Sequence, residues 1–140
     1  MSRRGLQITA VLVGALTYVV GAFLRMHLLQ YFHSSDHWLN SVNAFLIYTG
    51  TLLSGFIAGL LYRQGVFLTG FCAGGIGEFT HGIIKLLVSL HGAWIEVISL
   101  PSGYFIDLIF AVLISGILGA AGAASAVVAR QYRATNRGDG

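Results

Sequence analysis

Three long stretches of this chain contain no Asp, Glu, Lys or Arg: residues 5–24, 38–62 and 108–129, which are 20, 25 and 22 residues long. A helix needs roughly 20 apolar residues to cross the hydrocarbon core of a bilayer, which is about 30 Å thick. Lipid offers the backbone no hydrogen-bond partners, so each crossing segment must be helical, and the polar–apolar alternation of a strand is absent here. Charged residues make up only 9% of the chain, against about 25% in a soluble domain. The sequence therefore predicts a helical membrane protein and excludes water-soluble and nucleic-acid-binding classes.

A fourth segment, residues 66–92, is also long enough to cross a bilayer but carries Glu78, His81 and Lys85. With this segment included, we predict an all-α integral membrane bundle of four transmembrane helices, at about 6–32, 40–62, 66–92 and 104–130. The 140 residues would then form a single transmembrane domain that ends in a short mobile polar tail, residues 131–140.

The arginines predict how the bundle is oriented, because Lys and Arg are enriched on the cytoplasmic side of membrane proteins. Arg25 and Lys85 fall toward one side of the four-helix arrangement. The other arginines fall on the opposite side: Arg3, Arg4, Arg63, Arg130, Arg133 and Arg137. We therefore expect both termini in the cytoplasm, and the protein in the bacterial inner membrane. The apolar run after Arg4 is longer than the core of a cleaved signal peptide, so we expect it to remain as a membrane anchor.

Small residues recur at a spacing of four within the apolar segments. Helices in lipid associate through close backbone contact at such small residues, since no hydrophobic force drives them together. The expected packing residues are Gly55, Gly59, Gly70, Gly74, Ser115 and Gly119. They either hold the bundle together or form a face that contacts another subunit.

Glu78, His81 and Lys85 fall on one face of the third predicted helix, together with several small residues. Ionised groups inside a membrane cost several kcal/mol unless they face protein or water, and they often mark an ion or proton path. Arg25 and Asp107 lie at a similar outer depth in their own helices. One hypothesis is a polar path, open toward the outside, formed by these five residues. The alternative is a set of charge pairs that only fixes helix register, with Arg25–Asp107 and Lys85–Asp107 as the expected pairs.

The first outer loop holds a second cluster, with His33, Asp36 and His37. On one helical turn these residues would offer two imidazoles and a carboxylate, a ligand set that zinc or copper accepts. The alternative is a polar loop in the lipid headgroup layer with no bound metal.

Three motifs resemble those of small bacterial fluoride channels, which are similar in length and have four helices. The matching stretches, in order, are residues 21–25 (Gly-Ala-Phe-Leu-Arg), 42–43 (Val-Asn) and 74–80 (Gly-Gly-Ile-Gly-Glu-Phe-Thr). By this resemblance Asn43, Phe79 and Thr80 would line a pore, and the third helix would be interrupted near the glycines. Gly77-Glu78 stands where that family has a pair of threonines. Residues 54–75 are equally similar to small four-helix inner-membrane proteins with no assigned activity.

These observations leave three hypotheses about function. The first is an oligomeric channel or ion-coupled transporter whose polar path lies on the third helix. The second is a non-catalytic accessory subunit that packs into a larger membrane complex, and the third is an outer-surface metal-binding protein. We expect no enzymatic activity, because no nucleophile, base and orienting group can be assembled at one depth. The expected partners are the lipid bilayer and either further copies of this chain or other subunits, and not nucleic acid.

Overall fold

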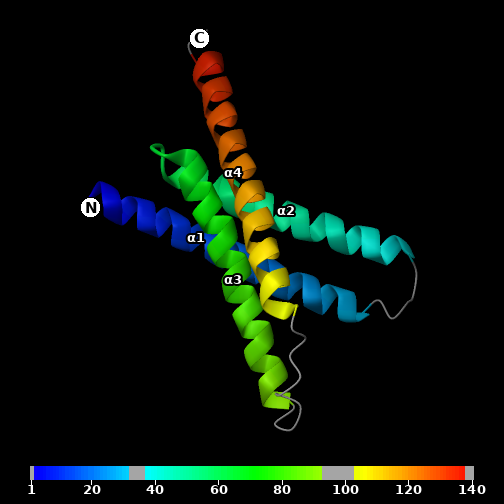
Figure 1. Ribbon diagram of the computed structural model, residues 1–140. Helices are drawn as coiled ribbons and strands as arrows, with labels where there is room; N and C mark the ends of the chain where they lie inside the picture. Colours follow the sequence, from blue (N-terminus) through cyan, green and yellow to red (C-terminus); the bar gives the residue numbers. More distant parts are fainter. Residues whose placement is uncertain (1, 32–36, 93–102, 138–140) are drawn as a thin grey trace.

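The computed structural model describes residues 2–31, 37–92 and 103–137, and all of these outside short turns are helical (Figure 1). The helices are α1 (Arg3–Tyr31), α2 (His37–Leu61), α3 (Val66–Gly92) and α4 (Tyr104–Arg137). The predicted all-helical fold class is confirmed. Three segments within these helices are long and apolar enough to cross a membrane: Arg3–Arg25, Ser41–Leu61 and Tyr104–Asn136. Helix α3 is not in this group, because its charged, histidine and glycine residues lower its mean hydropathy.

The helices form two antiparallel pairs, and the α1–α2 pair crosses the α3–α4 pair (Figure 1). Helix α3 packs along α4 and also contacts α1, while α2 contacts all three of the others. The turn between α2 and α3 depends on Gly65, whose φ of 60° lies in the left-handed region that favours glycine. The start of α1, this turn and the end of α4 lie toward the same end of the molecule.

The contact of α2 and α3 with α4 is made by small residues. A Cβ atom added to Gly59 would lie 2.8 Å from the Cα of Ala123, and one added to Gly119 would lie 3.2 Å from the Cα of Gly74. Real Cβ contacts are essentially never shorter than 3.0 Å, so the helix backbones approach as closely as glycine permits. The structure brings all of the expected packing residues into this one region: Gly55, Gly59, Gly70, Gly74, Ser115 and Gly119. These small residues thus contact each other within one chain.

The interior of the molecule is built from small side chains, and the large apolar ones point outward. The buried apolar residues are mostly alanines, such as Ala10, Ala58 and Ala126, whereas Leu16, Phe67 and Ile117 are exposed. This distribution is opposite to that of a soluble domain, in which large apolar side chains fill the core. It is typical of a helical membrane protein, whose exterior meets lipid and whose helices pack through small residues.

Helix α4 is longer than the sequence predicted. We expected it to end near residue 130 and to be followed by a polar tail, but it continues to Arg137. Arg, Gln and Ala are good helix formers, and basic side chains near a helix C-terminus interact favourably with the helix dipole. Residues 131–137 therefore extend the helix, and residues 138–140 lie outside the described part.

Candidate functional site

The most unusual polar contact joins the middle of α1 to the middle of α3. Tyr18 is only 4% exposed, and its hydroxyl donates a hydrogen bond to Oε2 of Glu78. Gly77 makes this contact sterically accessible, because a Cβ added there would lie 2.7 Å from the Cβ of Tyr18. The glycine thus lets α1 approach α3 beside the residue whose carboxylate the tyrosine binds.

His81 lies one helical turn after Glu78 and is 2% exposed. Its ring packs edge-on against Tyr18, with ring centroids 6.2 Å apart and an interplanar angle of 70°. Neither Nδ1 nor Nε2 of His81 has a hydrogen-bond partner among the groups of the described chain. A neutral imidazole offers one donor and one acceptor, and leaving a buried polar group unpaired costs about 1–3 kcal/mol. His81 is therefore a polar group whose hydrogen-bonding capacity is unused in this conformation.

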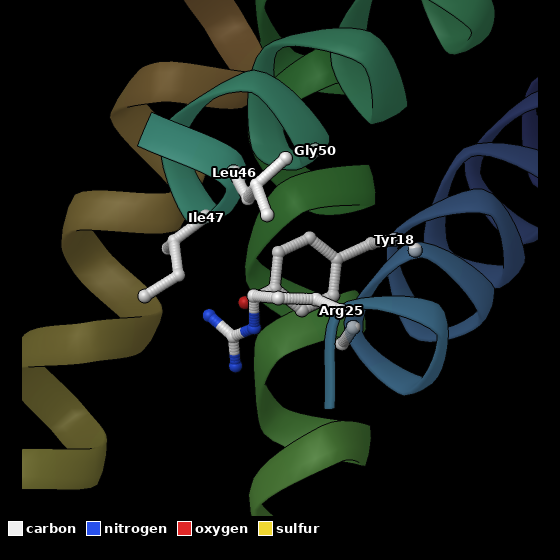
Figure 2. A pocket seen from close by; sticks show the side chains of 7 residues that line it. Tyr18, Arg25, Leu46, Ile47 and Gly50 are labelled. Atoms are coloured by element: carbon white, nitrogen blue, oxygen red, sulfur yellow. The ribbon is translucent and has the colours of Figure 1, made fainter. Parts of the chain in front are cut away.

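Arg25 lies two turns after Tyr18 and leaves the same side of α1, as Figure 2 shows. The two side chains border a small hollow of about 10 Å³ between α1 and α2. The other residues that line it are Gly21 and Ala22 of α1 and Leu46, Ile47 and Gly50 of α2. The Nε atom of Arg25 is enclosed and has no hydrogen-bond partner among the described groups. A hollow of this size is at the lower limit for one water molecule. Among the described residues, the hollow beside Tyr18 and Arg25 therefore has room for at most about one water.

Two further members of the predicted path lie near the surface. Lys85 and Asp107 are both exposed. The ion pairs expected between Asp107 and Arg25 or Lys85 are absent from the described side chains. Asp107 instead lies in the first turn of α4, where the helix dipole favours a negative charge.

The three residues assigned by resemblance do not form one site. Asn43 is partly buried, and its Oδ1 atom is enclosed without a hydrogen-bond partner among the described groups. Its spacing places it on the same face of α2 as Leu46, Ile47 and Gly50, the face that borders the Arg25 hollow. Phe79, by contrast, is 52% exposed.

Thr80, the third of these residues, is half-buried on α3. The fluoride-channel resemblance implies an interruption near this point, but α3 runs without a break from Val66 to Gly92.

The predicted metal ligands lie between α1 and α2 in the sequence and at the start of α2. His33 and Asp36 lie outside the described residues, and His37 is described only as the first residue of α2. Within the ranges that the structure describes, no three His, Cys, Asp or Glu side chains are grouped to hold a metal ion.

Comparison of the chain with models of protein families, with curated proteins and with solved structures gives no match.

Tyr18, which contacts both Glu78 and His81, was not among the site residues predicted from the sequence. The available signal was its spacing of seven residues from Arg25, with Gly21 and Ala22 between them. This pattern places an aromatic hydroxyl and a guanidinium on one small-residue face of α1.

Proposed function

We propose that this protein is a small channel or ion-coupled carrier of the bacterial inner membrane, in which Glu78 and His81 form the centre of the polar path. The observation that supports this proposal is the buried Tyr18–Glu78 hydrogen bond beside an imidazole with unused hydrogen-bonding capacity. Ionisable groups in membrane-spanning segments are rare, and they usually mark ion or proton paths.

The proposal places four helices across the membrane, with α3 crossing alongside the three apolar spans. Its 27 residues correspond to about 40 Å, more than the thickness of the hydrocarbon core. Glu78 follows Val66 by 12 residues, or about 18 Å along the axis, so its carboxylate lies near mid-membrane. Both termini are cytoplasmic in this arrangement, since Arg3, Arg63, Arg130 and Arg133 border two hollows that share Arg63 and Lys and Arg are enriched on the cytoplasmic side.

The Tyr18–Glu78 hydrogen bond acts as a gate in this proposal. In the proposal, Tyr18 closes the path in this conformation, and the neighbouring hollow of about 10 Å³ has room for about one water. Transport then requires Tyr18 to leave Glu78, which would expose the carboxylate and His81 to the path. Loss of the hydroxyl would weaken the closed state and raise passive leakage.

The polar cluster favours this function over the accessory-subunit hypothesis. That alternative depends on free glycine faces, whereas Gly55, Gly59, Gly70 and Gly74 pack on α4 within the same chain. Large apolar side chains such as Phe45 are exposed on the surface left for further copies or other subunits, and lipid would cover them equally well.

The proposal is tested by flux measurements in proteoliposomes, with an internal pH dye to follow protons and a fluoride electrode to follow the anion suggested by the resemblance. We expect the native chain to carry at least one of these ions and Glu78→Gln to lower that flux at least tenfold. Tyr18→Phe should raise passive leakage in the same assay. Tyr48→Phe is its matched control, since Tyr48 is exposed on α2. Equal flux in the native and Glu78→Gln proteins, or no flux of either ion in the native protein, would contradict the proposal.

A further inference from the structure

Two adjoining hollows bordered by arginines lie around the turn between α2 and α3. The larger, of about 410 Å³, is lined by Arg63, Arg130, Gln131, Arg133 and Ala134. The smaller, of about 240 Å³, is lined by Arg3, Leu6, Leu61, Tyr62, Arg63 and Gln64. Arg63, in the turn between α2 and α3, borders both, so the hollows form one basic surface.

The side chains of this surface have the chemistry of a phosphate site. The planar guanidinium group presents a fork of N–H donors that matches two phosphate oxygens, and the glutamine amides add further donors. No carboxylate lines either hollow among the described residues, and Asp139 lies outside the described part. Within the described part of the chain, the positive charges therefore have no carboxylate beside them in either hollow.

Arg130 provides an independent observation. Its Nη2 atom is enclosed by the protein and has no hydrogen-bond partner among the described groups. Enclosed donors in folded proteins are almost always paired, and donors on a charged group are the most costly to leave unpaired. Arg130 also lines the larger hollow, and a small rotation of its side chain would bring this donor to an acceptor seated there.

The depth of this surface indicates where the acceptor comes from. Arg130 follows Tyr104, the first residue of α4, by 26 residues, or about 39 Å along the helix axis. The hydrocarbon core is about 30 Å thick, and the headgroup layers extend it to about 40–45 Å. With Tyr104 at the outer boundary, Arg130 and Arg133 lie at the level of the inner headgroups. Leu6 and Leu61 in the smaller hollow supply an apolar wall next to the charges, as acyl chains require.

We propose that this surface binds an anionic glycerophospholipid, with the headgroup phosphate held by Arg63, Arg130 and Arg133. Neutral and zwitterionic lipids lack the net negative charge that this uncompensated basic surface selects. The proposal does not depend on the transport hypothesis, because none of these residues contacts the Tyr18–Glu78 cluster.

Native mass spectrometry of the purified full-length protein tests the proposal, with detergent micelles that contain phosphatidylglycerol or phosphatidylcholine. We expect retention of phosphatidylglycerol at least tenfold above that of phosphatidylcholine. Each of Arg63→Gln and Arg130→Gln should lower retention about fivefold, the usual effect of one basic residue at an anionic surface. Arg4→Gln is the matched control, because Arg4 is exposed at the same end but borders neither hollow; it should change retention less than twofold.

Three outcomes would overturn the proposal. Equal retention of the two lipids would show that the surface does not select anionic lipid. A loss of retention in Arg4→Gln as large as in Arg63→Gln would show that overall charge, and not this surface, causes the binding. Displacement of phosphatidylglycerol by millimolar inorganic phosphate would identify a free anion, and not a lipid, as the ligand. If Arg130→Gln fails to fold, Arg63→Gln and Arg133→Gln give the same test, because both side chains are exposed.

Discussion

Helix α3 makes two very different contacts along its length. Its first half packs on α4 through Gly70 and Gly74, where backbone touches backbone. Its middle meets α1 through Tyr18, Glu78 and His81, where large polar side chains fill the space between the helices. The first contact is tight and apolar and needs no further partner, whereas the second leaves hydrogen-bonding groups unused. We infer that the glycine contact between α3 and α4 holds the fold together and that the polar contact between α1 and α3 is the one that can rearrange.

The largest effect is expected from filling the glycine contact. In Gly119→Val, the new side chain would meet the backbone of Gly70 and the Cα of Gly74, which lies 3.2 Å from an added Cβ. Backbone atoms cannot move aside as side chains do, so we expect a loss of about 3 kcal/mol or more, the upper end for overpacking. Unfolding in detergent, followed by circular dichroism, measures this loss. Native stability in Gly119→Val would show that α3 and α4 do not pack as described.

The next effect concerns the hydrogen bond to Glu78. Tyr18→Phe keeps the ring and removes the donor, so it should cost about 1.5–3 kcal/mol, the usual range for a hydrogen bond to a charged group. The same unfolding measurement applies, with Tyr48→Phe as the control expected to cost less than about 0.5 kcal/mol. Equal stabilities of Tyr18→Phe and Tyr48→Phe would mean that the contact contributes nothing.

Replacing His81 should change stability and flux in opposite directions. In His81→Leu, the unused donor and acceptor are replaced by an apolar side chain, so the free energy of unfolding should rise by about 1–2 kcal/mol. Flux in proteoliposomes should fall at the same time, because the proposed path loses a polar member. A clear loss of stability instead would indicate that both nitrogens of His81 are already satisfied in the membrane.

The smallest effect is expected where the helices do not touch. An added Cβ at Gly21 meets nothing within 4 Å, so Gly21→Ala should leave stability unchanged or raise it slightly through the better helix propensity of alanine. Gly21 borders the hollow beside Arg25, and flux measured on the same sample shows whether this hollow belongs to the path. Destabilisation of Gly21→Ala by more than about 1 kcal/mol would place another element against this face.

The sequence predicts three of the helices from their uncharged runs of at least 20 residues, and the structure has a helix long and apolar enough to cross a membrane at each of these runs. Periodicity also places Glu78 and His81 on one face of α3. It does not reveal which helix meets that face, since spacing describes one helix and not its neighbour. The sequence therefore does not distinguish Tyr18 from the other aromatic residues of the apolar segments. Asp107 was expected to pair with Arg25 or Lys85, but depth alone does not bring side chains on different helices into contact.

The most direct test of the central claim is a double-mutant cycle on flux with Tyr18→Phe, Glu78→Gln and the combined variant. If Tyr18 controls the path through Glu78, Tyr18→Phe should raise passive leakage, and the combined variant should behave as Glu78→Gln alone. Such non-additivity is the signature of residues that act through one contact. Independent effects that multiply in the combined variant would contradict the account, because Tyr18 would then influence transport without Glu78.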